Sequence, residues 1–328
     1  MRVRQSNAVI YAVLLVTAFS GKTSWGADLI PLRATYAAIS GAFAPLWIAR
    51  DKGLFNKYGL DVDLKYMLSA SGTQALLSGS VDIVNPGAEL VEAGLAGARI
   101  AFIIGILNRA VLSIYSKPAL KLPSDLRGKI LAVTQPGSTT DLTARILLSQ
   151  FGLKPGKDVR ITYIQGMPDM MTALIQGRID AGVVSAPTTV KLRQAGLKEL
   201  VDVGARNIPM IHAGLATTRR FIKGNADTVR RYVKAYIEAT QVARTDPETT
   251  KQIIAKWTKT NNQEDLDETY ATYANAWEQA PYVFPAAMQT LLNFAVNPAG
   301  KTAKPERFID NSFVAELEKS AFIKELYK

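Results

Sequence analysis

The sequence predicts an α/β fold with two similar lobes, each a mostly parallel sheet flanked by helices. Three observations lead to this class. Strand-like and helix-like segments alternate along the chain, which is typical of βαβ units around a parallel sheet. A group of short motifs occurs twice, 93 to 98 residues apart. The length of 328 residues suits about two domains rather than one.

The repeat is the most informative of these observations. Its first copy contains Tyr58-Gly59-Leu60, Val62 to Tyr66, and Ala75 to Ile83; its second contains Phe151-Gly152-Leu153, Val159 to Tyr163, and Ala173 to Ala181. In each copy a helix ends at a glycine, an alternating strand follows, and a short helix ends at a second glycine before an aspartate. We expect Gly59, Gly152, Gly79 and Gly177 to be left-handed C-caps. Asp82 and Asp180, at a turn in both copies, are expected to be structural.

Hydrophobic patterning gives the remaining elements in chain order. Alternating or continuous apolar residues predict strands at 30–37, 62–66, 100–106, 111–115, 130–134, 161–163 and 183–185. The 3.6-residue period predicts helices at 42–51, 137–151, 226–245, 247–258, 264–280 and 284–295, and a short terminal helix at 310–319. Residues 118–127 are expected to form a loop, and residues 297–305, rich in Pro, Gly and Lys, a linker.

Residues 1–27 are typical of an export signal. Arg2 and Arg4 precede an apolar run from Ala8 to Phe19, and small residues follow. Twelve apolar residues are too few to span a bilayer of about 30 Å. We expect cleavage near Gly26 or Ala27, with a retained N-terminal anchor as the alternative. Because the chain has no cysteine, a lipid-anchored mature N-terminus is not expected.

Composition excludes several classes of protein. The absence of cysteine excludes disulfide scaffolds, thiolate metal sites and thiol nucleophiles, and the single histidine, His212, leaves no histidine pair for a metal. We therefore expect no metal and no cofactor. The net charge of +11 includes three cations in residues 1–27 and an excess of five cations in residues 118–208. This excess fits either a solvated basic surface or a basic cleft for an anionic ligand.

The sequence resembles the substrate-binding proteins of ABC importers of the sulfonate, nitrate, taurine and thiamine-precursor (NMT1/THI5-like) type. The resemblance covers about residues 30–295, and the segments that carry it are Ala44 to Phe55, Lys57 to Val62, Ala75 to Asp82, Leu126 to Val133, Gly137 to Thr139, and Ala173 to Asp180. It implies a two-lobed, type II-like periplasmic binding protein that closes on a small ligand, with the helical C-terminal region packed on lobe one. It also implies lobe one at 28–110 and 209–328, and lobe two at 111–208.

The resemblance implies a periplasmic monomer that traps a small organic molecule, expected to be an anion, and delivers it to a permease in the inner membrane. One segment departs from the family pattern. Where relatives often show an aromatic-Glu-Pro tripeptide, this chain has Ser185-Ala186-Pro187. A cation of the ligand would find no carboxylate or aromatic ring there.

Ligands of open parallel sheets bind beyond the carboxyl ends of the strands. Five small, polar loops occupy such positions, and they supply the predicted ligand-binding residues: Ser40, Gly41, Ala42, Ser71, Gly72, Gly87, Ala88, Gln135, Gly137, Ser138, Thr139 and Ser185. Each loop could equally serve only as a helix N-cap. Asn108 and Arg109 follow a buried strand near the first crossover; Arg109 could bind an anionic group or bridge the lobes.

Two other functions, an enzyme on this fold and a nucleic-acid-binding protein, fit the sequence less well. Enzymes that make pyrimidine precursors share this fold but rely on Cys and His, and this chain has no cysteine and one histidine. His212 lies in an apolar segment and is expected to be a core residue, so we expect no enzyme. Nucleic-acid binding would need a clustered basic face with aromatic platforms, and the chain has no dense run of Lys and Arg.

Overall fold

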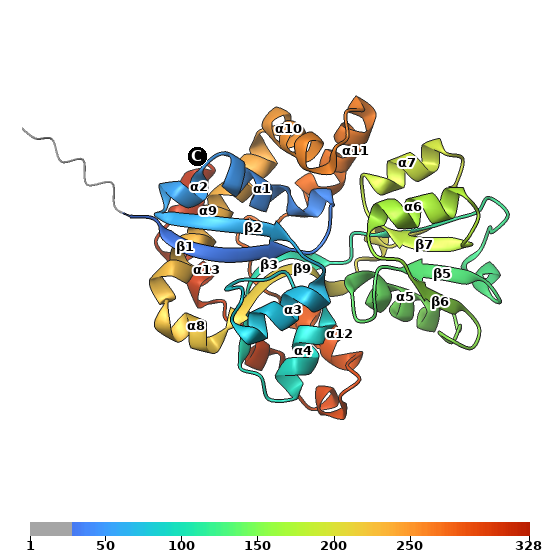
Figure 1. The fold of residues 1–328 in the computed structure, drawn as a ribbon, viewed down its shortest axis with the longest axis horizontal. Coiled ribbons are helices and arrows are strands. Elements are labelled where there is room, and N and C mark those ends of the chain that lie inside the picture. The colour runs from blue at the N-terminus through green and yellow to red at the C-terminus, as the bar shows by residue number, and fades with distance from the viewer. Residues whose placement is uncertain (1–27) are drawn as a thin grey trace, which may run out of the picture.

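The computed structural model describes residues 28–328, so the export signal expected at 1–27 lies outside the described residues. Figure 1 shows two α/β bodies side by side. The chain passes from the first body to the second between β3 and β4, and it returns between β8 and β9. The first body therefore holds the N-terminal and C-terminal parts of the chain, and the second body holds the middle.

The strands of the first body are β1 (Ile30–Tyr36), β2 (Leu60–Tyr66), β3 (Ile100–Arg109) and β9 (Pro209–Thr218). β1 and β2 are parallel, and β3 and β9 are antiparallel. Single bridges from Ala34 to Ile83 and from Val84 to Ala216 join the two pairs. The resulting layer is parallel except for β9, which is the strand by which the chain re-enters this body.

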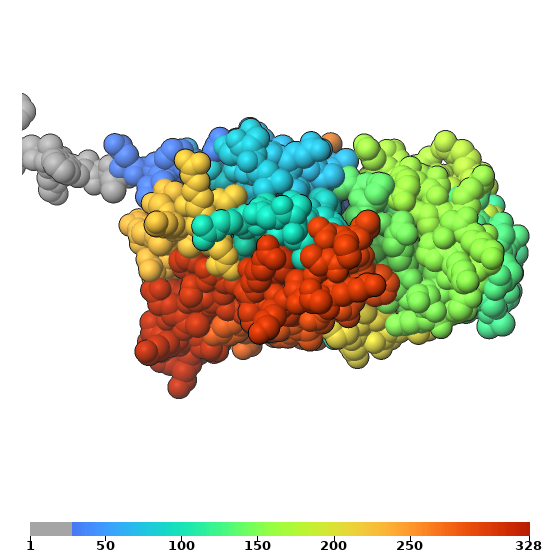
Figure 2. All heavy atoms as spheres, turned by 90° about the horizontal axis from the view of Figure 1, so that it is seen from below, coloured from blue at the N-terminus to red at the C-terminus, as the bar shows by residue number. Residues whose placement is uncertain are grey.

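Helices cover both sides of this layer (Figure 1). They are α1 (Ala44–Asp51), α2 (Leu54–Lys57), α3 (Ser69–Ser78), α4 (Ala88–Leu95), α8 (Arg219–Gly224), α9 (Ala226–Thr245), α10 (Pro247–Thr258), α11 (Gln263–Ala274), α12 (Pro285–Asn293), α13 (Ser312–Lys319) and α14 (Phe322–Leu326). The long α9 packs on α1 and α2, where the ring of Tyr232 stacks on Phe55 with centroids 5.0 Å apart. Figure 2 shows the C-terminal residues packed against the N-terminal half of the same body.

The second body is one five-stranded sheet in the order β6-β5-β7-β4-β8. Its strands are β4 (Ser113–Ser116), β5 (Ile130–Val133), β6 (Arg160–Tyr163), β7 (Ala181–Val184) and β8 (Lys198–Asp202), and its helices are α5 (Thr139–Gln150), α6 (Met167–Ile175) and α7 (Thr188–Gln194). Only β4 runs against its neighbours. Like β9, it is the entry strand of its body; no helix connects it to a preceding strand of the same sheet, so the βαβ rule does not apply to it.

The two copies of the repeat share the same glycine conformations and the same hydrogen bonds. The four predicted C-cap glycines have φ between 67° and 79°, which confirms their left-handed conformation. Asp82 accepts from the backbone N–H of Arg33 at 2.9 Å, and Asp180 accepts from that of Ile130 at 2.9 Å. Each aspartate also pairs with a cation, Arg33 in the first case and Lys117 in the second. Both aspartates are therefore structural, as predicted.

Three predicted elements differ in the structure. The helix expected at 42–51 begins as a separate 3-10 turn, η1 (Gly41–Phe43). The helix expected at 264–280 ends at Ala274, where Arg244 from α9 binds the carbonyl groups of Ala274 and Trp277. The linker expected at 297–305 contains the 3-10 turns η4 (Pro298–Lys301) and η5 (Pro305–Phe308). Two further 3-10 turns, η2 (Pro123–Leu126) and η3 (Gly204–Arg206), belong to the second body.

The strand β8 had no counterpart in the prediction. The strand, Lys198–Asp202, is charged at three of five positions and lies at the edge of the sheet.

Among residues 28–328, no helix is both long and apolar enough to cross a membrane.

Candidate ligand-binding site

A cleft lies between the two bodies, and its empty volume, counted with its opening to solvent, is about 750 Å³. Most lining residues follow the carboxyl ends of strands or begin helices. The lining consists of Ala37, Ala38, Ile39, Ser40, Phe43, Tyr66, Leu68, Ser69, Asn85 and Pro86, with Leu112, Thr134, Gln135, Ser138, Thr139, Thr140, Gly166, Met167, Pro168, Ser185 and His212.

On the first body, the polar side chains of the cleft are held by hydrogen bonds to neighbouring groups. Ser40 caps η1 by accepting from the Ala42 N–H at 3.4 Å, and its Oγ lies 3.1 Å from the Tyr273 hydroxyl. Burial raises the pKa of Tyr273 to about 12, so this hydroxyl stays protonated. Asn85 donates through Nδ2 to the carbonyl of Gly214 at 2.7 Å.

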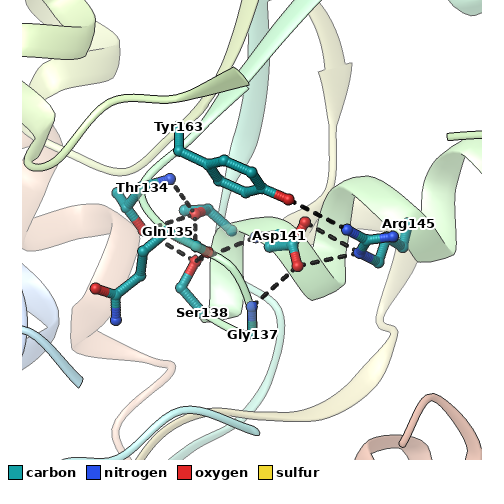
Figure 3. A network of polar contacts seen from close by, with 8 residues as sticks. Thr134, Gln135, Gly137, Ser138, Asp141, Arg145 and Tyr163 are labelled. Carbon is teal, nitrogen blue, oxygen red and sulfur yellow. Dashed lines mark hydrogen bonds and ion pairs between the residues drawn. The ribbon is translucent and has the colours of Figure 1, made fainter. Parts of the chain in front are cut away.

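On the second body, the loop between β5 and α5 forms a closed polar network, shown in Figure 3. The Ser138 hydroxyl donates to the Gln135 carbonyl at 2.8 Å and accepts from the Asp141 N–H at 3.3 Å. Asp141 in turn accepts from the Gly137 N–H and from Arg145, each at 3.0 Å. Ser138 is therefore the N-cap of α5, and its hydrogen-bonding capacity is largely used within the loop.

The two bodies touch across the cleft. Gln135 donates through Nε2 to the Ser69 hydroxyl at 2.5 Å, and the Ala88 N–H donates to the Gly137 carbonyl at 2.9 Å. At the other side, the Gly41 N–H donates to the Ala186 carbonyl at 3.4 Å. The two bodies are therefore in contact on both sides of the cleft.

His212 lies in β9, one of the segments that connect the bodies, and it lines the cleft. Its Nδ1 accepts from the N–H of Val111, which belongs to the other connection, at 2.9 Å. Burial lowers the pKa of the imidazole to about 4, so the ring is neutral at physiological pH. The carbonyl of His212 accepts from the Thr139 hydroxyl at 3.0 Å.

Electrostatically, the cleft is neutral: its lining in the described part of the chain contains no Lys, Arg, Asp or Glu. Two neighbouring helices also carry a carboxylate at their N-termini. Glu89 accepts from the Gly87 N–H at the start of α4, and Asp141 accepts from the Gly137 N–H at the start of α5, both at 3.0 Å. These carboxylates occupy amides that an anionic ligand could otherwise use.

The structure brings five of the predicted site residues together in this cleft, namely Ser40, Gln135, Ser138, Thr139 and Ser185. Gly41 and Ala42 are buried beneath it, with Gly41 packed against Thr269 and Tyr273. Ser71 and Gly72 lie further along α3 than the lining residue Ser69. Gly87, Ala88 and Gly137 lie in the seam between the bodies and not in the main lining.

Asn108 and Arg109 lie outside the cleft. Asn108 is buried and binds the backbone at Tyr282 and Phe284, at 2.8 and 3.0 Å. Arg109 donates to the Asn207 side chain at 3.1 Å and lines a second cavity, separated from the cleft by Leu112 and Ser185. Neither residue is among those that line the main cleft.

Several lining residues were not predicted as ligand-binding residues, among them Tyr66, Asn85, Thr134, Met167 and His212. Tyr66 ends β2, and Asn85 and Thr134 directly follow strand segments, so the strand-end rule reaches all three. Met167 begins α6, which the same rule reaches through the loop after β6. The sequence predicts a core residue at His212 because its segment is apolar. No local pattern shows that the imidazole lies at the connection between the bodies.

Comparisons with known proteins agree with this architecture. The sequence profile of a family described as NMT1/THI5 like matches residues 40–250. A relative from Brucella abortus (strain 2308) is 28% identical over 242 residues, which cover 71% of this chain and 73% of the relative.

Two solved structures have the same fold. The periplasmic nitrate-binding protein NrtA from Synechocystis PCC 6803 superimposes with a TM-score of 0.74 at 17% identity, covering 92% of this chain and 91% of NrtA. The alkanesulfonate-binding protein SsuA from Xanthomonas axonopodis pv. citri, bound to MOPS, gives 0.70 at 18% identity, covering 86% and 97%.

Proposed function

Because the chain belongs to the NMT1/THI5-like family of ABC-importer substrate-binding proteins, we propose that it captures a small organic molecule in the periplasm and delivers it to a membrane permease. Residues 1–27 would direct export and be removed, leaving a monomer without a lipid anchor. The single observation that carries the proposal is the cleft between the two bodies, lined by strand ends from both.

The proposed mechanism is hinge closure. Residues 28–110 with 209–328 would form one lobe, and 111–208 the other, joined by the two segments that contain Val111 and His212. The cross-cleft bonds from Gln135 to Ser69 and from Ala88 to Gly137 can exist only when the lobes are together. A ligand that contacts both lobes would therefore shift the population toward this closed form.

For the ligand class, the neutral cleft favours an uncharged molecule with hydrogen-bonding groups. The apolar part of such a molecule would rest on Phe43, Tyr66, Leu112 and Met167, and its polar atoms would face Gln135, Asn85 and His212. The cation excess of the second body does not reach the cleft. Six of its exposed cations, Lys121, Arg127, Lys129, Lys154, Lys157 and Arg160, lie at or before the amino ends of β5 and β6, whereas the carboxyl ends of these strands face the cleft.

An anionic ligand, expected from the sequence, is the second candidate. The net positive charge and the N-terminus of α3, which has no acidic residue in its first turn, favour it. The two ligand classes share the same mechanism of capture and differ only in the chemistry of the bound group.

An enzymatic function on this fold has less support. The chain has no cysteine nucleophile, and the Nδ1 of its one histidine is bound to a backbone N–H. A base at this position would have only Nε2 facing the cleft, with no carboxylate in the described lining to orient it.

A thermal-shift screen tests the proposal. Residues 28–328 would be heated with uncharged heterocycles and amides in one arm, and with nitrate, alkanesulfonates and carboxylates in the other. A ligand at about 100 times its Kd stabilises the native state by about 2.7 kcal/mol, which raises Tm by several degrees. We expect the uncharged arm to contain the ligand. A hit confined to the charged arm would support the anion instead, and a chain that no member stabilises would contradict capture of these molecules.

A further inference from the structure

Within the proposed ligand-binding function, on which this inference rests, we propose that His212 determines specificity. Its Nε2–H is a hydrogen-bond donor in the lining of the cleft, and it selects ligands that present an acceptor atom there. The proposal follows from which nitrogen of the ring carries the proton, from how the ring is held, and from how the other polar groups of the cleft are used.

The position of the proton follows from the partner of Nδ1. A backbone N–H can only donate, so the Val111 N–H at 2.9 Å requires an unprotonated Nδ1. The neutral ring must then carry its proton on Nε2. A doubly protonated ring would direct two N–H groups at each other, and this bond therefore opposes the imidazolium in the same direction as burial does, which lowers the pKa to about 4.

The ring is fixed relative to both bodies. Val111 lies between β3 and β4, where the chain first crosses, and His212 lies in β9, where it returns. The Thr139 hydroxyl, at the start of α5, holds the main chain of His212 by donating to its carbonyl. Rotation of the imidazole would break the bond to Val111, so the direction of Nε2–H is set by the hinge itself.

Three other donor groups of the cleft already have acceptors. The Thr139 hydroxyl donates to His212, the Ser138 hydroxyl donates to Gln135, and Gln135 donates through Nε2 to Ser69. By contrast, Nε2 of His212 has no hydrogen-bond partner among residues 28–328, although the residue lines the cleft. A bound ligand without an acceptor would leave this donor without a partner and cut off from water. Such a ligand loses far more affinity than one that merely lacks a methyl group.

The first experiment determines which nitrogen of the imidazole ring carries the proton. His212 is the sole histidine of the sequence, so 15N-labelled protein gives one imidazole pattern in a ring-nitrogen NMR spectrum. At neutral pH we expect a protonated Nε2 and an unprotonated Nδ1. Pyrimidine, which is uncharged and has ring acceptors, should shift the Nε2–H resonance at millimolar concentration, and benzene, with the same shape and no acceptor, should leave it in place. Methanesulfonate tests an anionic acceptor.

Three results would overturn the proposal: a proton on Nδ1, an imidazolium at neutral pH, or an Nε2–H resonance that pyrimidine and methanesulfonate both leave unmoved. A shift caused by methanesulfonate alone supports the donor role and assigns it to an anionic acceptor.

Two variants at position 212 then distinguish a loss of ligand recognition from a loss of folding. His212→Asn keeps an acceptor near the position of Nδ1 for Val111 and removes the distal donor; His212→Gln places an amide N–H near the position of Nε2. Using the acceptor probe that shifts the ring, we expect affinity to fall about 10-fold in His212→Asn and to recover in His212→Gln. Equal affinity in wild type and His212→Asn would refute the specificity role while leaving ligand capture intact. If the thermal-shift screen finds no ligand, ligand capture itself fails, whatever the tautomer.

Discussion

Replacing Arg193 by glutamine should shift the protein toward an open form. Arg193 lies in the last turn of α7 on the second body, and its two terminal guanidinium nitrogens pair with Glu268 of α11 on the first, one bond being 2.8 Å long. Gln194 adds a bond to Asp265 at 3.2 Å. Figure 1 shows α7 and α11 facing each other from the two bodies. The pair therefore forms only when the bodies are closed.

The size of the expected effect follows from the solvent exposure of the two paired side chains. The side chains of Arg193 and Glu268 are 44% and 36% exposed, so solvent screening limits the pair to about 0.2–1 kcal/mol. Its two-bond geometry favours the upper end, and about 1 kcal/mol changes the ratio of closed to open forms roughly fivefold. Apparent ligand affinity should fall by up to the same factor, because it scales with the population of the competent form.

Small-angle X-ray scattering without ligand measures the open fraction, and calorimetry measures affinity. The matched control is Arg127→Gln, which removes the same charge but breaks a pair to Asp158 within the second body. High salt should erase the difference between Arg193→Gln and wild type by screening the pair. Identical scattering of the Arg193 variant and wild type at low salt, or an equal change in the Arg127 control, would refute the reasoning.

Three further predictions concern stability. Gly41→Ala should cost about 1–3 kcal/mol, because the added methyl group overlaps side chains of α11, and an unchanged urea midpoint would contradict this packing. Asn108→Ala should cost about 1–3 kcal/mol by leaving two partly buried backbone groups without partners, again measured in urea; a cost below 1 kcal/mol would show that water replaces them. Acid should remove about 3 kcal/mol between the ordinary pKa of histidine, 6.5, and the folded value of about 4, because the unfolded chain binds the proton of His212 first. That loss should be absent in His212→Gln, and its persistence there would assign it to other groups.

The repeat made most of the fold predictable, because its signals are local. A left-handed glycine and an aspartate that binds the neighbouring strand need only residues within one βαβ unit, and both occur in each body. Elements that depend on distant partners were missed or misjudged. The end of α11 is set by Arg244, some thirty residues earlier in the chain. The edge strand β8 is held by pairing with β4, and its polar sequence shows no strand pattern.

For the site, the strand-end rule located the loops, but it could not say how their side chains are used. Ser138 is in the cleft as predicted, yet its hydroxyl is satisfied by its own loop. Arg109, the one cation proposed for the ligand, lies in a different cavity. His212 was judged by the apolar residues beside it, whereas its position depends on Val111, about a hundred residues away in sequence.

Charge shows most clearly why a shared fold does not fix a shared ligand. Parallel strands place their carboxyl ends together at the cleft and their amino ends together at the far side, so a cation excess in the sequence can belong to either end. In the second body, the exposed cations at the far end, such as Lys129 and Arg160, do not line the cleft, and α5 beside the cleft begins with its own carboxylate. A helix N-terminus favours an anion only where the chain leaves its amides free, and in this protein Glu89 and Asp141 each occupy one. In the proposed function, the fold would supply the position of the ligand, and these few carboxylates and the one imidazole would decide its charge and its acceptor.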